Sequence, residues 1–334
     1  MQKATMTTTP LPIMTTTNLD WPTDWDAIFG AKRPLILDIG FGYGHSLAYL
    51  QAAHPDHNII GLEVDNTSLR KAEKRIPRER WANVRVVGGF AETALQHLFP
   101  PERLQQIHVN FPDPWFKARH AGRRLIKRAT LDAIASRLVV GGLLYLATDI
   151  IEYAEMSRDL LRQTPALVNA LPSDWAEERP QPFATKYEAR ARKEGRPCHY
   201  FVYRRADVSA PIVPTITELP MPHIVFKTPL DLDAMMQAVA TPNYHDDGLT
   251  IKFLDRYRGA RAVLFEVFIH EPTLDQRIAF VLVEKEDESG AFTLKLSALG
   301  HPRPTAGVQN AARIIADGLL ALSPDVSVIH DKIG

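Results

Sequence analysis

The sequence has a single cysteine, no net charge and no long apolar run, and each of these absences excludes a class of protein. Cys198 has no second cysteine with which to form a disulfide, so a reducing compartment suits the chain. No apolar run approaches the roughly 20 residues that span a bilayer, and the Thr-rich start lacks the apolar core of a signal peptide. No set of His, Cys, Asp and Glu has the spacing of a metal site. We therefore expect a soluble, cytoplasmic protein without a metal or a membrane contact.

The neutral total hides two parts of opposite charge. Residues 1–210 contain 28 Lys and Arg against 23 Asp and Glu, whereas residues 211–334 contain 11 against 16. Because a polyanion is attracted to the more basic part of a chain, any nucleic acid is expected to bind the first part. The 334 residues and the apolar content of 45% suit two globular domains.

Strands and helices are predicted to alternate five times in the first part. The first pair consists of the apolar run Leu35–Ile39, a loop that contains Gly40, Gly42 and Gly44, and a helix that begins at His45. Glycines permit a positive φ and a close approach of the backbone to a ligand, and a helix N-terminus offers free N–H groups. The alternation predicts an α/β fold with a parallel, doubly wound sheet. The loop alone does not distinguish dinucleotide, nucleotide and methyl-donor sites.

Acidic residues lie at or just after the ends of these strands. Glu63 lies 25 residues after Asp38, where an acid commonly binds ribose hydroxyls, and Asp65 is a candidate N-cap for the next helix. Asp113 lies between two prolines, which cannot extend the interior of a sheet. Asp149 follows the fifth strand. Parallel sheets carry their sites at the carboxyl ends of the strands, so these acids are candidate site residues.

A strongly basic segment follows Asp113. Its certain cations are Lys117, Arg119, Arg123, Arg124, Lys127 and Arg128. This density indicates phosphate contacts, although a run of Lys and Arg is more often a solvated helix face. Asp113 has two interpretations. It is either a catalytic acid or a structural residue that caps the following basic helix, expected to run to about Leu138, or stabilises its own turn.

Composition divides the chain into four segments. Residues 1–20 are expected to be disordered, residues 21–206 to form the α/β domain, and residues 207–222 to form a Pro-rich linker. Residues 223–334 are expected to form a smaller α+β domain. It has no motif that indicates a reaction, so we interpret it as an accessory module. Its alternating run from residue 262 to residue 269 leaves a homodimer open.

Five short sequence segments, taken in their order and spacing, are characteristic. They are LDIGFGYG, IIGLEV, VNFPDPWFKARHAGRRL, LATD and TKYEARARKEGRP, and they cover about residues 35–205. In these phrases the chain resembles the bacterial tRNA (guanine-N7-)-methyltransferase family. The resemblance implies a class I methyltransferase fold with a Rossmann-like, seven-stranded sheet, S-adenosyl-L-methionine as the methyl donor, and tRNA as the partner. The implied reaction is methyl transfer to guanine N7 in the variable loop, at position 46.

The resemblance also implies roles for individual residues. The donor-binding positions are Asp38, Gly40, Gly42, Gly44, Glu63, Phe90, Ala91 and Asp113. The substrate-binding positions, phosphate contacts included, are Lys117, Arg119, Arg123, Arg124, Asp149, Thr185 and Glu188. Asp113 is the implied catalytic acid. Phe90 departs from the family, which usually has Asp or Asn beside adenine, so adenine is expected to stack on Phe90 or to bond the Ala91 backbone.

The implied chemistry suits these residue types. Neutral guanine N7 has a lone pair and no proton, so attack on a sulfonium methyl is an in-line displacement that mainly requires positioning. Positive charge moves onto the purine, where a fixed carboxylate such as that of Asp113 stabilises it. Glu188 and Asp149 are predicted to accept hydrogen bonds from guanine N1–H and the 2-amino group, which selects guanine over adenine.

Three other functions fit part of the sequence. Methylation of a guanine elsewhere in RNA would use the same base pocket. A non-catalytic RNA-binding protein of this fold is supported only by Phe90, and the intact Asp38 and Asp113 oppose it. A dinucleotide oxidoreductase leaves the FPDPW and TKYE segments unexplained.

Overall fold

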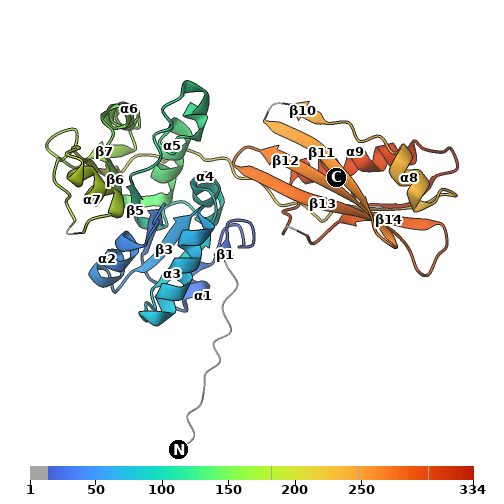
Figure 1. The fold of residues 1–334 in the computed structure, drawn as a ribbon, viewed down its shortest axis with the longest axis horizontal. Helices are drawn as coiled ribbons and strands as arrows, with labels where there is room; N and C mark the ends of the chain where they lie inside the picture. Colours follow the sequence, from blue (N-terminus) through green and yellow to red (C-terminus); the bar gives the residue numbers. More distant parts are fainter. Residues whose placement is uncertain (1–13, 182, 247, 300) are drawn as a thin grey trace, which may run out of the picture. The chain divides into compact units, whose positions relative to one another are not determined.

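The computed structural model describes residues 14–181, 183–246, 248–299 and 301–334, and the chain divides into two compact units, residues 1–214 and 215–334. Each unit has its own sheet and its own apolar core (Figure 1). Within the described ranges, no helix combines the length and the apolar character needed to cross a bilayer. The same ranges contain no group of three or more His, Cys, Asp and Glu side chains placed to hold a metal ion.

The first unit is built on an eight-stranded, mostly parallel sheet. Its strands are β1 (Met14–Thr15), β2 (Leu35–Ile39), β3 (Asn58–Glu63), β4 (Val84–Gly88), β5 (Leu104–Asn110), β6 (Leu138–Thr148), β7 (Leu167–Asn169) and β8 (His199–Arg205). Their order is β1-β4-β3-β2-β5-β6-β8-β7, and β8 runs antiparallel to both of its neighbours. The Rossmann-like sheet expected from the sequence is confirmed.

Helices cover both faces of this sheet (Figure 1). They are α1 (Trp25–Phe29), α2 (His45–Ala53), α3 (Asn66–Arg78), α4 (Ala91–Thr93), the π-helical η1 (Ala94–Leu98), the 3-10 helix η2 (Ala118–Arg123), α5 (Arg128–Arg137), α6 (Ile151–Arg162) and α7 (Lys186–Lys193). On one face, Ile36 packs with α2 and α3. On the other, Leu35 and Leu37 pack with α1, α5 and α6. Because successive strand residues point to opposite faces, strands that are buried on both sides read as continuous apolar runs.

The start of the described chain differs from the expected disorder and adds an eighth strand to the seven expected. Met14–Thr15 pairs in parallel with β4, and the Thr16 N–H donates to the Gly88 carbonyl over 2.9 Å. Gly89 has a φ of +150°, and a Cβ there would lie 2.3 Å from Thr16 Oγ1. The end of β4 and the glycine that follows it therefore accommodate a segment whose composition indicates disorder. Residues 1–13 lie outside the described residues.

The basic helix expected after Asp113 is interrupted. The 3-10 helix η2 ends at Arg123, and α5 begins only at Arg128. Between them, the Ile126 N–H donates to the Tyr153 hydroxyl over 3.2 Å instead of to a helical carbonyl. The N-caps of η2 and α5 are Lys117 and Lys127, so the interpretation of Asp113 as a helix cap is wrong.

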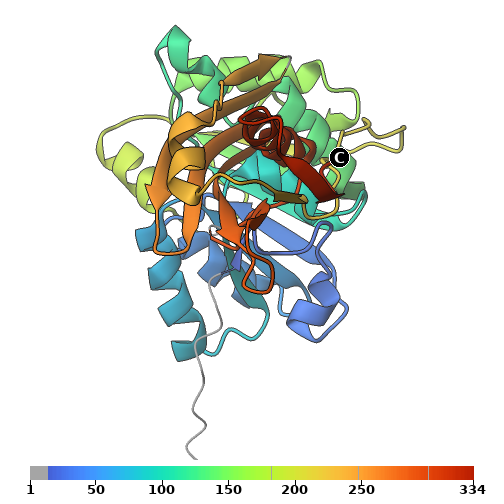
Figure 2. The same ribbon diagram turned by 90° about the vertical axis from the view of Figure 1, so that its right-hand side faces the viewer.

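The second unit is the α+β domain that the sequence predicts. Its strands are β9 (His223–Lys227), β10 (Tyr244–Asp246), β11 (Leu249–Arg258), β12 (Ala262–Glu271), β13 (Leu274–Glu284), β14 (Ala291–Leu296) and β15 (Ser327–Asp331). They form an antiparallel sheet in the order β10-β11-β12-β13-β14-β9-β15. The helices α8 (Leu232–Ala238) and α9 (Ala306–Leu320) pack against the sheet around Phe265 and Phe280 (Figure 2). The short β10 and β15 were not expected, because neither has a buried residue to give an apolar pattern.

Candidate functional site

The loop between β2 and α2 has the backbone of a ligand-binding glycine loop. Gly40, Gly42 and Gly44 have φ values of +71°, +53° and +72°, a region that other residues rarely adopt. Gly44 is the N-cap of α2 and provides no side chain to accept from the first amides of the helix. Those amides can therefore donate to a ligand.

Asp38, at the end of β2, is completely buried beneath this loop. The Ser46 hydroxyl donates to its Oδ2, whereas Oδ1 has no hydrogen-bond partner among the described residues. Burial, together with the negative charge of Glu63, raises the pKa of this carboxyl to about 7, against the opposing effects of Ser46, Arg179 and Asn110. A buried carboxylate with a vacant acceptor position can receive a donor group from a ligand.

Glu63 ties the end of β3 to the glycine loop. Its carboxylate accepts from the backbone N–H of Gly42 over 2.9 Å, of Val64 over 2.8 Å and of Asp65 over 3.0 Å. A carboxylate has about four acceptor positions, so one is left for a further donor. Asp65 caps α3 by accepting from the Ser68 N–H over 2.8 Å, which confirms its predicted capping role.

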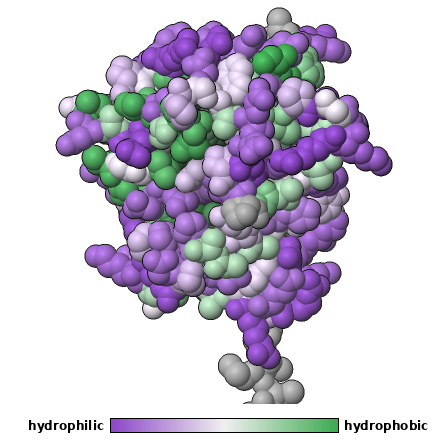
Figure 3. All heavy atoms as spheres, turned by 90° about the vertical axis from the view of Figure 1, so that its left-hand side faces the viewer, coloured by the Kyte–Doolittle hydropathy of each residue, from purple (hydrophilic) through white to green (hydrophobic). Residues whose placement is uncertain are grey.

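Phe90 is exposed to solvent at the carboxyl end of β4. Its side chain is 63% exposed, and that of Val64, at the end of neighbouring β3, is 58% exposed. The face of this unit drawn in Figure 3 is mainly hydrophilic, with apolar side chains gathered in places. An exposed aromatic ring in such a surface is a stacking platform for a base. Glu92, two residues after Phe90, forms an ion pair of 3.0 Å with Lys127.

The Phe111–Trp115 turn after β5 holds Asp113 in a strained backbone. Phe111 and Trp115 have φ values of +53° and +43°, which is rare for bulky residues and typical of functional sites. The Arg124 guanidinium fixes the turn by donating to the carbonyl oxygens of Pro114, over 3.0 Å, and Trp115, over 3.2 Å. The Asp113 side chain is exposed and lines an open pocket with Lys117.

The cations of the basic segment have different environments. Lys117, Arg119 and Arg123 are exposed, and the Arg123 guanidinium lies 5.1 Å from the centre of the Trp115 ring. Arg124 donates hydrogen bonds to the backbone of the turn, and Lys127 forms an ion pair with Glu92. The structure therefore leaves the first three available for phosphates and places Arg124 in a supporting position that the sequence did not indicate.

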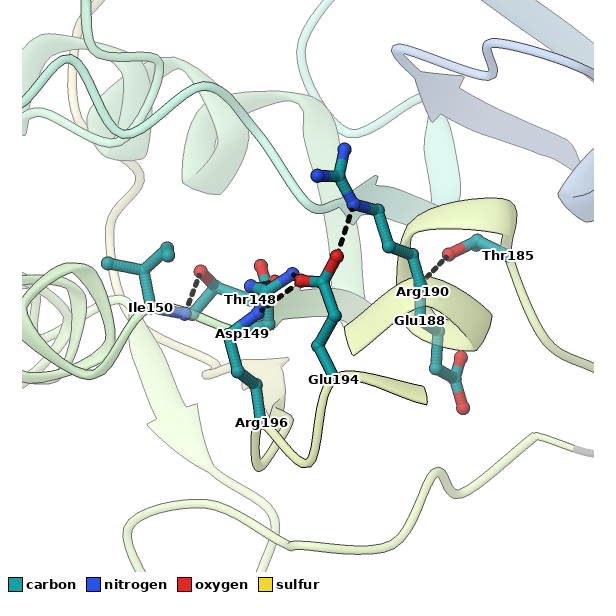
Figure 4. Close-up of polar contacts among 8 residues, drawn as sticks. All are labelled: Thr148, Asp149, Ile150, Thr185, Glu188, Arg190, Glu194 and Arg196. Carbon is teal, nitrogen blue, oxygen red and sulfur yellow. Dashed lines mark hydrogen bonds and ion pairs between the residues drawn. The ribbon is translucent and has the colours of Figure 1, made fainter. Parts of the chain in front are cut away.

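The two acids expected to bind guanine are not brought together (Figure 4). Asp149 forms an ion pair with Arg196, which also pairs with Glu194 over 2.8 Å. Asp149 is not the N-cap of α6, because that position is held by Ile150. Glu188 points away from this chain of ion pairs and is 1% exposed, with its two oxygens held by Arg179 over 2.6 Å and Arg192 over 2.8 Å.

Thr185 has a clear local role at the start of α7. Its hydroxyl accepts from the Glu188 N–H over 3.1 Å, so the TKYE phrase forms a helix N-cap. The turn also lines a pocket with Gly40, Gly42 and Ser46 of the glycine loop region and Asn110 of β5. The start of α7 is thus part of the wall of the pocket beside the glycine loop.

Sequence reasoning missed Asn110 and Arg179. The Arg179 Nη1 donates to Asn110 Oδ1 over 3.1 Å, which links the end of β5 to Glu188 on α7. Asn110 directly precedes the FPDPW phrase, and this position was the one available signal. Arg179 lies in an irregular segment, where no periodic pattern shows which side chains are buried.

Comparisons with known proteins agree with this architecture. The family model described as a putative methyltransferase matches residues 32–201. A tRNA (guanine-N(7)-)-methyltransferase of Thermus thermophilus is 31% identical over 313 residues, which are 93% of this chain and 96% of that protein. A protein of the same name from Burkholderia vietnamiensis is 38% identical over 182 residues, 54% of this chain and 71% of that protein.

Among solved structures, the 16S rRNA methyltransferase KamB covers 58% of this chain and 99% of its own, with a TM-score of 0.43 and 13% identity. The similarity to the Thermus protein is longer than the first unit, so it includes part of the second, in which the sequence showed no recognisable motif. Since this similarity extends over nearly the whole of both chains, the chain belongs to the tRNA (guanine-N(7)-)-methyltransferase family.

Proposed function

We propose that the chain transfers the methyl group of S-adenosyl-L-methionine to N7 of the guanine at position 46, in the variable loop of tRNA. The observation that carries the proposal is the placement of the glycine loop and the Asp113 turn after β2 and β5, which are neighbouring parallel strands. A donor on the loop would then lie beside Asp113. Family membership supports the donor, tRNA and guanine N7, whereas position 46 is the finer part of the proposal.

In this proposal the carboxyl ends of β2, β3 and β4 hold the donor. Gly40, Gly42 and Gly44 let its methionine part approach the backbone, and Glu63 accepts from a ribose hydroxyl. Adenine stacks on Phe90 and bonds the backbone of Ala91. The bound donor supplies a methyl group on a positively charged sulfur, which is the electrophile of the reaction.

Asp113 is the proposed catalytic residue. Guanine N7 attacks with its own lone pair, so the protein has to orient the base and stabilise the positive charge that develops on the purine. The strained, Arg124-braced turn fixes the backbone from which the Asp113 side chain extends. A carboxylate that is already oriented stabilises the developing charge without reorganisation during the reaction.

We assign guanine recognition to Asp149 rather than to both predicted acids. Asp149 is partly exposed and has an ion-pair partner, Arg196, that can be exchanged for the guanine N1–H. Glu188 is buried, and releasing its oxygens would leave the buried Arg179 charge without a partner. Glu188 is therefore proposed to hold α7 in place, with Thr185 as its cap.

Methyl transfer from labelled S-adenosyl-L-methionine to unmodified tRNA tests the proposed function. We expect methyl transfer to wild-type tRNA and no transfer to a tRNA with adenine at position 46. A chemical reaction that cleaves the RNA strand at N7-methylguanine should then cut the methylated tRNA at position 46. Transfer that persists with adenine at position 46 would move the site to another guanine. A folded, full-length protein that binds tRNA without transferring a methyl group would support the non-catalytic alternative.

The adjacent Arg123 and Arg124 provide a matched pair of variants. Arg123→Ala is expected to weaken tRNA binding and to reduce the slope of log Kd against log salt by roughly 1, because one exposed phosphate contact is lost. Arg124→Ala is expected to lower kcat instead, since the Asp113 turn loses two charge-assisted hydrogen bonds. Filter binding at several salt concentrations and single-turnover methylation measure the two effects. Equal effects of the two variants on the salt slope would contradict this division.

We further propose that the protein works in a reducing cytoplasm, which its single, buried Cys198 supports. The second unit is proposed to be an accessory module. The homodimer stays a prediction, and light scattering of the full-length protein at several concentrations would test it.

A further inference from the structure

Two phenylalanines are exposed after the carboxyl ends of strands in the first sheet. Of the phenylalanines in the described ranges, only Phe90 and Phe116 are exposed, by 63% and 67%. Phe90 follows β4, and Phe116 follows the turn after β5. The strand order β4-β3-β2-β5 places the glycine loop, which follows β2, between these two strand ends. Phe90 is the proposed stacking platform for adenine, whereas the steps described above give Phe116 no function.

The backbone on both sides of Phe116 is fixed. On the N-terminal side, the Arg124 guanidinium donates to the Trp115 carbonyl oxygen over 3.2 Å. On the C-terminal side, the Lys117 carbonyl oxygen accepts from the His120 N–H over 2.8 Å, within the first turn of η2. The Phe116 ring is therefore held in solvent by an anchored segment, and it gains free energy from any apolar or aromatic surface that covers it.

Phe116 lines the same open pocket as Asp113. The pocket has a volume of about 480 Å³, which lies within the range of about 300–1,000 Å³ that is usual for ligand sites. Its other aromatic walls are Trp115 and His120. The Trp115 ring already has two neighbours, the Arg123 guanidinium at 5.1 Å and the His120 ring at 5.7 Å. The Phe116 ring is thus the aromatic surface of this pocket that is most open to a ligand.

The charges at this pocket indicate a nucleic acid as its occupant. Lys117, Arg119 and Arg123 are exposed on and beside the pocket wall, and Asp113 is the acid among the lining residues. Cations attract phosphates, and an aromatic face stacks on a base, which is the combination that single-stranded nucleic acids bind. A folded RNA offers such a base when one nucleotide is extruded from its stack. The occupant is therefore an extruded base.

We propose that the Phe116 ring is the platform on which the target guanine stacks during methyl transfer. A stacked base has its plane fixed and its edges free. Guanine N7 lies on an edge, so the ring sets the direction of the N7 lone pair, and an in-line displacement requires that direction to match the sulfonium methyl. Asp113 stabilises the charge on the same base from within the same pocket. This assignment rests on the proposed function, because it takes a tRNA guanine as the methyl acceptor.

Phe116→Leu and Phe116→Trp separate stacking from simple apolar contact, because leucine lacks a π face and tryptophan has a larger one. Phe116→Leu is expected to lower kcat/KM for tRNA by about 5- to 100-fold, the effect of losing one stacked base. Phe116→Trp should stay within about threefold of the wild type, since it restores the stack. Methylation with labelled S-adenosyl-L-methionine at several tRNA concentrations measures both. A wild-type kcat/KM in Phe116→Leu would overturn the assignment.

The fluorescence of 2-aminopurine at position 46 of the tRNA reports stacking directly, because a stacked aromatic neighbour quenches it. With S-adenosylhomocysteine at saturation, the complex of the full-length Phe116→Leu variant should be brighter than the wild-type complex. Phe90→Leu is the matched control, since it removes an equally exposed ring on the donor side. It should raise the KM for S-adenosyl-L-methionine and leave the fluorescence unchanged. Equal fluorescence of the wild-type and Phe116→Leu complexes would refute the stack.

A purely structural role of Phe116 gives a different result. If the ring only held the basic segment in place, Phe116→Leu would reduce the slope of log Kd against log salt, because phosphate contacts would be lost. The stack predicts an unchanged slope together with the lower kcat/KM. A wild-type protein that transfers no methyl group would contradict the proposed function itself, whereas wild-type transfer with an unaffected Phe116→Leu variant would contradict only the platform.

Discussion

Replacing Asp113 with asparagine is expected to lower kcat by about 10²- to 10³-fold, the usual cost of removing one fixed electrostatic contact to a transition state. Asparagine has the same size and keeps the turn, but it carries no negative charge to stabilise the positive charge that forms on guanine. Single-turnover methylation with saturating donor and tRNA measures kcat separately from binding.

Asp207→Asn is a suitable control for this variant. Asp207 is an exposed aspartate just after β8, and the same change of charge there should leave kcat unaffected. If Asp113→Asn retained most of the wild-type rate, the carboxylate would not be the stabilising group. Its strained turn would then serve only to place the basic segment that follows.

Replacing Asp38 with asparagine is expected to abolish tight donor binding and, at the same time, to stabilise the protein at pH 8. The carboxyl is fully buried and its pKa is raised from 3.8 to about 7, so at pH 8 the folded protein holds a buried negative charge. An amide of the same shape avoids this cost, which is on the order of a few kcal/mol. Thermal unfolding and calorimetry with S-adenosylhomocysteine measure the two opposite effects.

The stabilisation expected from Asp38→Asn depends on pH. Between about pH 4 and pH 7 the folded protein retains a proton on Asp38 that the unfolded chain has released, so the stability contributed by this group falls as the pH rises. The stabilisation by Asp38→Asn should therefore be largest at pH 8 and vanish toward pH 4. In the wild type, donor binding should tighten as the pH rises through about 7, because only the ionised carboxylate attracts the positively charged donor. A stabilisation that did not depend on pH would show that burial of the charge is not its cause.

The sequence by itself determined the parallel sheet, the glycine loop and the point at which the chain leaves the sheet before Asp113. Continuous apolar runs that alternate with helical segments required a buried parallel sheet, and glycines at three alternate positions of one loop permitted the left-handed backbone found there. Prolines on both sides of Asp113 required the chain to leave the sheet at that point. Each of these inferences depends on a residue and its immediate neighbours along the chain, so the sequence was sufficient for them.

Only the tertiary structure decided which polar side chains are available to a ligand. Arg123 and Arg124 are adjacent and chemically identical, yet one faces solvent and the other braces the Asp113 turn. Glu188 was expected to bind guanine, but it is buried between two arginines, one of them Arg179. The physical reason is that hydrogen bonds and ion pairs form between groups close in space, and Arg179 and Asn110 are 69 residues apart in the chain. No periodicity in a sequence specifies such a pair, because folding alone brings its two members together.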